Sequence, residues 1–367
     1  MIRVLMMIDE AGTGGGQNHV ALLATGLDRE RFQVHLLCGE EGPLVERLKA
    51  VGIGVSVGKM SNRPSATSLV VCRREIRRFG PDLVHTHGGT AGFTGRVGSI
   101  GLRGLKRVHT YHGLHYLHDR RSLRNRMFRH VDAVLLGVTD RIICVAESDM
   151  ELGKEYGVVD QEKTSVIRNG IDLAQFLNLQ RNVQPGAPVV GVIGRLHIQK
   201  GHRWFLEAAS KVVRDVPSAR FRIIGDGELR SELMRQAAEL GLRDRAEFPG
   251  DRQEIATELG EVDLLVIPSL WEGLPLVLLE AMAAGVPVVA SAVDGILEAA
   301  ENGREALLVP PADSSALASA MIRLLQHPAE ASRLASAARL RVRREFSAER
   351  MVERTAALYD TVVTGGS

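Results

Sequence analysis

Short apolar segments alternate with longer stretches of helical periodicity along the whole chain, and this alternation restricts the fold more than any other feature. It is typical of parallel βαβ units, because two parallel strands need a crossover that usually contains a helix. In the first half, strands are predicted at residues 3–8, 33–37, 83–85, 108–112 and 141–145. The pattern begins again after a polar stretch at 178–188, with strands at 189–193, 220–224, 246–248, 264–267, 286–290 and 306–309.

This restart predicts an α/β protein of two domains, each with a doubly wound parallel sheet. We place the first domain at 1–177 and the second at 178–346. Helical spacing after Ser347, a candidate N-cap, predicts a closing helix at 347–363 that packs back on the first domain. Ligands of such sheets bind at the carboxyl ends of the strands, so we expect the site in a cleft between the two domains.

Composition and chain pattern exclude several classes of protein. The chain is 45% hydrophobic and 25% charged, as globular proteins are, and its longest apolar runs are shorter than the roughly 18–20 residues of a membrane-spanning helix. The start MIRVLMMIDE lacks the layout of a secretory signal, so we expect a cytoplasmic protein. The three cysteines, Cys38, Cys72 and Cys144, have no CxxC spacing and are expected to be buried residues rather than disulfides or zinc ligands.

The positive charge of the chain is concentrated in its first half. Residues 1–172 hold 24 Lys and Arg against 19 Asp and Glu, and the stretch 103–130 has a single acid, Asp119. A field of this kind can attract nucleic acid, an anionic membrane or a phosphorylated substrate, or can be only a solvated surface. The basic residues of the stretch are Arg103, Lys106, Arg107, Arg120, Arg121, Arg124, Arg126 and Arg129.

Two glycine-rich turns follow predicted strands. Gly14, Gly15 and Gly16 precede a helix expected at 20–27, which places backbone amides at a helix N-terminus, where phosphate groups bind. Gln17 stands where the GxGxxG fingerprint of dinucleotide-binding enzymes has a glycine, so a nicotinamide oxidoreductase is disfavoured. The second turn, Gly225–Gly227, can likewise either bind a ligand or be only a tight turn.

Four histidines recur every three residues: His109, His112, His115 and His118. The first two flank a predicted strand end, so the four do not share one helix face, and no carboxylate or cysteine completes a ligand set. We therefore expect no metal site here. His112, at the carboxyl end of its strand and just before a glycine, is the histidine placed to reach a ligand.

The second half carries cations and carboxylates near predicted strand ends. Arg195 and Lys200 follow the strand at 189–193, where they can bind a diphosphate without a metal and stabilise charge on a leaving group. Glu272 and Glu280 are separated by an almost wholly apolar segment, and a helix beginning near Pro275 leaves Glu272 in the preceding loop. Carboxylates in such surroundings usually make hydrogen bonds.

Together these motifs resemble the retaining glycosyltransferases of family 4, whose GT-B fold has two Rossmann-like doubly wound parallel-sheet domains facing a cleft. The resemblance extends along nearly the whole chain. Two segments depart from the common pattern: Val293–Glu298 replaces Gly-Gly-x-x-Glu, and Arg168-Asn169-Gly170 replaces Pro-Asn-Gly. The motifs that carry the resemblance are Gly14–Gly16, Thr110–Gly113, Val145–Ser148, Val166–Asp172, Gly194-Arg195, Gln199–Gly201, Gly225–Gly227 and Glu272–Pro287.

The resemblance implies roles for individual residues. The second domain would bind a nucleotide-sugar donor and the first domain an acceptor. Glu280 would bind the ribose hydroxyls and His112 would contact the transferred sugar. The implied catalytic residues are His112, Glu272, Arg195 and Lys200. The implied donor-binding residues are Gly15, Gly16, Arg195, Lys200, Gly225, Asp226, Gly227, Phe248, Arg252, Glu272, Gly273, Leu274 and Glu280.

The resemblance also implies a reaction: a hexosyltransferase moves a sugar from a UDP- or GDP-linked donor to a lipid-linked or envelope polysaccharide acceptor, by same-face displacement with retention. No cofactor, essential metal or nucleic-acid partner is expected. The stretch 103–130 would attach the enzyme peripherally to the anionic inner face of the cytoplasmic membrane or bind a phosphorylated acceptor. A non-catalytic nucleotide-sugar-binding module and a sugar-nucleotide epimerase are the alternatives.

Overall fold

The computed structural model describes residues 1–59, 65–118, 122–179 and 186–365. The chain forms two compact units, Met1–Gly170 with Ala348–Ser367 and Ile171–Ser347. The first unit ends at Gly170 and not at the expected residue 177, because the short helix α7 (Leu173–Leu177) packs on α11 (Leu276–Ala284) of the second unit. Part of the expected linker at 178–188, residues 180–185, lies outside the described residues.

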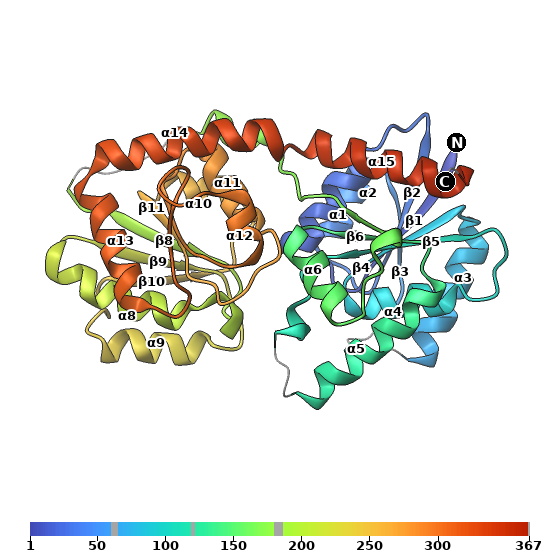
Figure 1. Ribbon diagram of the computed structural model, residues 1–367, viewed down its shortest axis with the longest axis horizontal. Coiled ribbons are helices and arrows are strands. Elements are labelled where there is room, and N and C mark those ends of the chain that lie inside the picture. Colours follow the sequence, from blue (N-terminus) through green and yellow to red (C-terminus); the bar gives the residue numbers. More distant parts are fainter. Residues whose placement is uncertain (60–64, 119–121, 180–185, 366–367) are drawn as a thin grey trace. The chain divides into compact units, whose positions relative to one another are not determined.

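The first unit is built on a parallel sheet of seven strands in the order β3-β2-β1-β4-β5-β6-β7 (Figure 1). The chain order reverses between β1 and β4, and this is the point at which doubly wound sheets bind their ligands. Five of the strands correspond to predicted ones, and the two outermost strands, β3 and β7, were not expected. The bounds are β1 Ile2–Ile8, β2 Phe32–Cys38, β3 Gly54–Val57, β4 Leu83–His87, β5 Lys106–Tyr111, β6 Arg141–Cys144 and β7 Thr164–Val166.

Helices cover this sheet, and the last helix of the chain is one of them. Met351 and Tyr359 of α15 lie in the same buried cluster as Val4, Val20 and Leu23, so the C-terminal segment completes the core of the first unit. The α-helices are α1 Gly15–Gly26, α2 Pro43–Ala50, α3 Ala66–Phe79, α4 Gly89–Gly98, α5 Leu123–Leu135, α6 Glu147–Glu155 and α15 Ala348–Thr364; short 3₁₀ turns span His115–Leu117, Leu136–Val138 and Gln161–Lys163.

The second unit has a parallel sheet of six strands in the order β10-β9-β8-β11-β12-β13. Its strands are β8 Val189–Ile193, β9 Arg220–Ile224, β10 Ala246–Gly250, β11 Leu264–Ile267, β12 Val288–Ser291 and β13 Leu307–Val309. Besides α7 and α11, its helices are α8 His202–Asp215, α9 Arg230–Glu239, α10 Ile255–Gly260, α12 Asp294–Ala299, α13 Ser314–Gln326 and α14 Pro328–Glu345, with a 3₁₀ turn at Ile198–Lys200.

The apolar faces of these elements fill one core in the second unit. Val190, Phe205 and Phe221 are fully buried in it, with Phe205 and Phe221 packed edge to face. The three cysteines of the chain are free and buried, as expected. None of the helices among the described residues is both long and apolar enough to cross a membrane.

Candidate active site

The loops at the carboxyl ends of the second sheet pack tightly against one another. The backbone amide of Gly194, after β8, donates to the carbonyl of Ile224 at 2.9 Å. A Cβ atom at Gly225, after β9, would lie 2.2 Å from the Gly194 carbonyl oxygen. A Cβ atom at Gly201 would lie 1.9 Å from the carbonyl oxygen of Pro268, and its φ of +65° disfavours other residues as well. Only glycine fits at these two positions, so the loops after β8, β9 and β11 lie close together.

Glu272 lies in the loop after β11 and is 5% exposed. One of its carboxylate oxygens accepts hydrogen bonds from Lys200 Nζ at 2.6 Å and from Ser269 Oγ at 2.7 Å. The other oxygen faces Gln199 Nε2 at 3.4 Å. A buried carboxylate is stable when it is paired and hydrogen-bonded in this way. The structure therefore brings together Lys200 and Glu272, two predicted site residues that are 72 positions apart.

Asp294 is a site residue for which the sequence predicted no role. Its Oδ2 accepts a hydrogen bond from the backbone amide of Glu272 at 2.9 Å. Its φ is +35°, a left-handed conformation that non-glycine residues rarely adopt and that is concentrated at functional sites. A Cβ atom at the next residue, Gly295, would lie 1.9 Å from the carbonyl oxygen of Gly273. The start of α12 thus holds the segment containing Glu272, Gly273 and Leu274.

Glu280 lies in the second turn of α11 and is buried. Burial raises the pKa of its carboxyl group to about 7, since water no longer stabilises the charged form. A carboxyl group with a pKa near neutrality changes its hydrogen-bonding ability within the physiological pH range.

The remaining donor-site candidates of the second unit have varied surroundings. Arg195 is exposed. The Asp226 carboxylate accepts from the Gly227 amide at 2.7 Å, and the Phe248 carbonyl accepts from Arg230. The Arg252 guanidinium lies 3.2 Å from the Glu258 carboxylate, so this cation is paired with an acid of its own unit.

In the first unit, Gly15 and Gly16 are the first residues of α1, and His112 follows β5. A Cβ atom at Gly16 would lie 3.6 Å from Cδ2 of His112, so the glycine turn and this histidine are neighbours at the carboxyl edge of the sheet. His112 thus lies at the carboxyl end of its strand, as expected, and its role in ligand binding stays a prediction.

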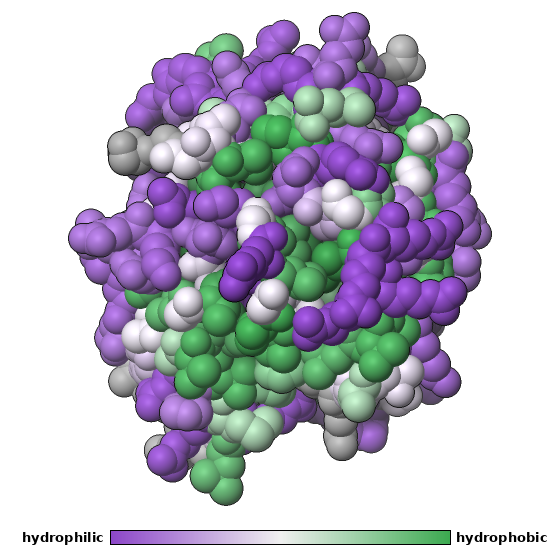
Figure 2. All heavy atoms as spheres, turned by 90° about the vertical axis from the view of Figure 1, so that its right-hand side faces the viewer, coloured by the Kyte–Doolittle hydropathy of each residue, from purple (hydrophilic) through white to green (hydrophobic). Residues whose placement is uncertain are grey.

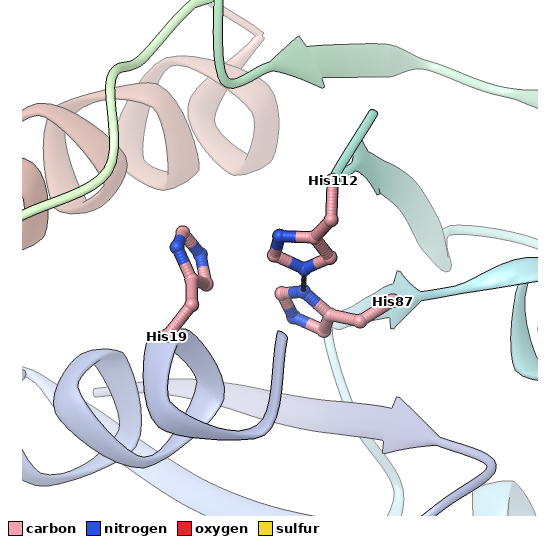
Figure 3. A group of neighbouring side chains, drawn as sticks. All are labelled: His19, His87 and His112. Carbon is pink, nitrogen blue, oxygen red and sulfur yellow. Dashed lines mark hydrogen bonds between the residues drawn. The ribbon is translucent and has the colours of Figure 1, made fainter. Parts of the chain in front are cut away.

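Two further histidines that the sequence analysis did not select lie beside His112. Figure 3 shows His19, on α1, and His87, at the end of β4, with their rings close to that of His112. Nδ1 of His87 is 3.1 Å from Nε2 of His112, and Nδ1 of His19 is 3.0 Å from Oδ1 of Asn169. Burial lowers the pKa of His19 to about 4 and the pKa values of His87 and His112 well below the usual value. All three imidazoles are therefore neutral at pH 7.

The quartet with a spacing of three is divided between different elements. His109 is buried within β5, where its Nδ1 lies 2.8 Å from Thr86 Oγ1, and His115 begins a 3₁₀ turn. Sequence reasoning missed His19 and His87 because it compared histidines that are close in sequence. His87 could have been found from its place at the carboxyl end of a strand. Because β4 pairs with β5, the carboxyl ends of the two strands meet, and His87 lies beside His112.

Comparisons with known proteins agree with this architecture. The family described as Glycosyltransferase Family 4 matches residues 13–175, and the family described as Glycosyl transferases group 1 matches residues 187–327. The UDP-Gal:alpha-D-GlcNAc-diphosphoundecaprenol alpha-1,3-galactosyltransferase of Escherichia coli is 29% identical over 318 residues, which cover 81% of both chains. A glycogen synthase of Mycobacterium tuberculosis is 32% identical over 238 residues, 64% of this chain and 57% of that protein.

Solved structures share the fold of the whole chain. Anabaena Alr3699/HepE in complex with UDP and glucose superposes with a TM-score of 0.86 at 22% identity, covering 98% of this chain and 100% of that one. Sucrose-phosphate synthase from Thermosynechococcus elongatus superposes with a TM-score of 0.84 at 23% identity, covering 100% of both chains. With two Rossmann-like sheets and family matches in both halves, the chain belongs to the family 4 glycosyltransferases, the group 1 glycosyl transferases of GT-B fold.

Proposed function

We propose that this enzyme is a retaining hexosyltransferase that transfers a sugar from a UDP-linked donor to a lipid-linked or envelope polysaccharide acceptor. The observation that carries the proposal is the contact between Lys200 and Glu272 at the carboxyl edge of the second sheet, beside glycine turns that keep the loops close. The relatives support the choice of substrates. The name of the E. coli relative includes UDP-Gal and a diphosphoundecaprenol acceptor, and Alr3699/HepE was solved with UDP.

In this proposal the cations of the second unit bind the donor diphosphate. Lys200 is partly exposed, and Arg195 is exposed in the loop after β8, so both side chains have access to a ligand. Ammonium and guanidinium groups form strong charge-assisted hydrogen bonds with phosphate oxygens. They also stabilise the charge that grows on the diphosphate as it leaves, which is the way a preorganised site lowers a barrier.

The carboxylates hold the sugars of the donor. Glu280 accepts hydrogen bonds from the ribose hydroxyls, and Glu272, with the amides of Gly273 and Leu274, holds the transferred hexose. The other donor contacts come from Gly225, Asp226 and Gly227 and from the segment Phe248–Arg252, which lie near the base. His112 and the turn at Gly15 and Gly16 contribute from the first unit, His112 by contacting the transferred hexose.

The reaction that fits these groups keeps the anomeric configuration. The bond between the anomeric carbon and the diphosphate oxygen breaks as the acceptor oxygen bonds to the same face of that carbon. The acceptor hydroxyl proton passes to the departing diphosphate, so the protein needs no nucleophile of its own. The main contributions of the protein are positioning and electrostatic stabilisation of the leaving group, and we propose that neither a metal nor a cofactor is required.

We propose that α5 brings the enzyme to an anionic membrane surface that holds the acceptor. The side chains of Leu123, Met127 and Val134 are 76%, 57% and 63% exposed, and their spacing of four and seven places them on one face of the helix. Arg124, Arg126 and Arg129 of the same helix are exposed as well. Helices that combine an exposed apolar face with basic residues bind at the surface of anionic lipid.

Not all of the basic stretch 103–130 is available to lipid. The Arg107 guanidinium is engaged inside the unit, with Nη2 donating to the Ser99 carbonyl at 2.6 Å. Arg120 and Arg121 lie outside the described residues. On the face shown in Figure 2, the side on which α3 lies in Figure 1, apolar side chains form a continuous area bordered by polar ones. Exposed apolar side chains are not limited to α5, since Val70 of α3 is 66% exposed. Variants of α5 in the vesicle experiment therefore identify the contribution of this helix.

Transfer is tested by incubating the enzyme with UDP- and GDP-linked hexoses and a polyprenyl-diphosphate-linked sugar, with a chelator present. We expect a product with retained anomeric configuration from one UDP-linked donor, as judged by NMR. Nucleotide binding without turnover on any acceptor would favour a binding module, and a changed donor sugar would favour an epimerase.

Membrane attachment is tested by sedimentation with vesicles of phosphatidylcholine with and without phosphatidylglycerol. We expect binding only to the anionic vesicles, weakened by salt and by the double variant L123S/M127S. A matched surface variant, Leu340→Ser on α14, should bind like the wild type, because Leu340 is exposed but belongs to the second unit. Equal binding by L123S/M127S and the wild type would contradict the role of α5.

A further inference from the structure

The rings of His19, His87 and His112 form the one group of three or more metal-ligating side chains found among the described residues. One ring nitrogen of each lies within 4.8 Å of those of the other two. The three come from α1, from the end of β4 and from the residue after β5, so three different elements fix their positions (Figure 3).

The hydrogen bond to Asn169 fixes how His19 presents its ring. Nδ1 of His19 is 3.0 Å from Oδ1 of Asn169. An amide oxygen can only accept, so Nδ1 of His19 carries the proton and Nε2 presents its lone pair. A metal-binding histidine usually donates its second ring nitrogen to such an oxygen, which fixes the tautomer and the ring orientation. Asn169 therefore has the position and chemistry of an outer partner of a metal ligand.

The other two rings already have nearly the spacing of two ligands of one ion. Nδ1 of His87 and Nε2 of His112 are 3.1 Å apart. Two nitrogens that bind one tetrahedral zinc at about 2.0–2.1 Å are roughly 3.3 Å apart. An ion bound by both nitrogens lies to one side of the line between them, so the rings turn towards it while the distance between their nitrogens changes little. From a separation of at most 4.8 Å, His19 has to approach by no more than about 1.5 Å.

The cluster is also incompletely hydrogen-bonded. Nε2 of His87 is buried and has no hydrogen-bond partner in the described part of the chain. Buried polar atoms are rarely left in this state, and this nitrogen can take up the proton of the ring when Nδ1 binds an ion. The ring of His87 is thus held by a single hydrogen bond, the one to His112.

From these observations we infer that His19, His87 and His112 form a binding site for Zn²⁺ that inhibits sugar transfer. Three imidazoles with a fourth position open to water are a donor set that suits zinc. On binding, the proton between His87 and His112 moves to the other nitrogen of the ring that carries it, so the rings bind the ion as neutral imidazoles. The ion also holds His112, which is then withdrawn from the hexose; this inhibitory effect rests on the proposed function.

Metal binding is tested on the full-length, chelator-treated protein with no nucleotide present. Titration with Co²⁺ should give the visible ligand-field bands of a tetrahedral site at one equivalent, and Zn²⁺ should displace the cobalt. H19Q and H87Q should bind at least about 10-fold more weakly. H130Q, which changes an exposed histidine of α5, should bind like the wild type. Equal zinc affinity in H19Q, H87Q and wild type would overturn the proposal.

Asn169→Ala keeps all three histidine ligands. It therefore tests the site even if the histidine variants lose zinc binding because they do not fold. We expect this variant to bind zinc about 10–100-fold more weakly, because His19 loses its outer partner. Asn169→Asp should bind zinc at least as tightly as the wild type, since a carboxylate is a stronger acceptor. Unchanged affinity in both Asn169 variants would contradict the assignment of His19 as a ligand.

Inhibition is measured separately from binding. Zinc should reduce turnover with the same midpoint as the metal titration, a chelator should restore turnover, and H19Q should need at least about 10-fold more zinc. Zinc binding without any loss of turnover would overturn the inhibitory role. If no donor and acceptor support turnover although the metal titration succeeds, the proposed function fails while the zinc site stands.

Discussion

The ammonium group of Lys200 lies 2.6 Å from a carboxylate oxygen of Glu272. In the proposed function, Lys200 binds the donor diphosphate and Glu272 holds the transferred hexose. In this proposal the diphosphate and the hexose bonded to it meet at this ion pair, and donor binding has to redistribute the hydrogen bonds of the pair. In the proposed function, Ser269 and Gln199 keep Glu272 hydrogen-bonded while Lys200 turns to the phosphates.

Removal of this cation is expected to impair catalysis more than folding. We expect Lys200→Ala to lower kcat/KM by about 10²–10³, comparable to the loss of one donor in an oxyanion hole. The matched control is Lys211→Ala, because Lys211 also lies in the second unit but bonds Ser314 and Ser315 instead. Steady-state kinetics with circular dichroism of both variants checks this. If Lys200→Ala had the kcat/KM of the wild type, the assignment of Lys200 to the donor diphosphate would be contradicted.

Asp294 allows backbone strain to be separated from hydrogen bonding. Its φ of +35° suits asparagine and glycine better than alanine, and its carboxylate accepts from the Glu272 amide. We expect activity and thermal stability to decrease in the order Asp294→Asn, Asp294→Gly, Asp294→Ala. The glycine variant loses only the carboxylate that accepts from the Glu272 amide. The alanine variant loses this acceptor and also keeps the strain of a side chain at positive φ. If alanine matched asparagine in both measurements, the bond to Glu272 would have no role in the site.

The raised pKa of Glu280 makes donor affinity depend on pH. With a pKa of about 7 in the folded protein, Glu280 is protonated in mildly acidic solution and cannot accept fully from two ribose hydroxyls. Affinity for a UDP-hexose should therefore rise as the pH increases through about 7. Calorimetric titrations of wild type and Glu280→Gln across this range check it, and the variant should show no such rise. A rise of equal size in Glu280→Gln would assign the titration to another group.

The same group affects folding with a defined sign. The pKa of Glu280 in the folded state lies above its ordinary value of 4.5, so the unfolded chain loses its proton first as the pH rises. Stability of the ligand-free protein should therefore fall between pH 4.5 and about 7, and less so in Glu280→Gln. Denaturant unfolding at several pH values measures this difference between the two proteins.

Tyr359 of α15 forms a hydrogen bond that connects the last helix of the chain with the central strands of the first unit. Its hydroxyl is 2.5 Å from Nδ1 of His85, whose Nε2 is 2.7 Å from Thr110 Oγ1, and both ring systems are buried. Tyr359→Phe leaves the buried His85 nitrogen without this partner and should cost about 1–3 kcal/mol of unfolding free energy. Urea unfolding should show this loss, while Thr361→Val, a change on the exposed side of α15, should stay within about 0.5 kcal/mol of wild type. Equal stability of Tyr359→Phe and wild type would contradict the structural role of the bond.

The central strands could be predicted because each contains a short apolar run of the sequence that is also buried in the fold. The bounds predicted for β8, β9 and β11 are those observed. β8 and β11 are short runs of mainly branched apolar residues, and β9 ends in the buried pair Ile223 and Ile224. β3 and β7 were not predicted. They are the two edge strands of the first sheet, they have four and three residues, and none of those residues is buried. Without a buried face, such a strand carries no apolar run that the sequence could reveal.

Site residues were predictable where a motif contains them and not where only the fold brings them together. Lys200 and Glu272 lie in motifs and were selected. Asn169 also lies in a motif, Val166–Asp172, but its partner His19 is 150 residues away, and their hydrogen bond depends on how the chain returns to α1. Asp294 lies in a segment that departs from the family pattern, and its role follows from a backbone conformation that the sequence does not specify.

Hydrogen exchange with and without UDP locates the nucleotide on the chain and so tests the proposed donor site. We expect UDP to slow exchange in residues 194–201, 225–227 and 269–280 with a chelator present, and to cause no such change in Lys200→Ala at the same UDP concentration. Protection confined to other segments, or equal protection in Lys200→Ala, would contradict the assignment of the donor diphosphate to this edge of the second sheet.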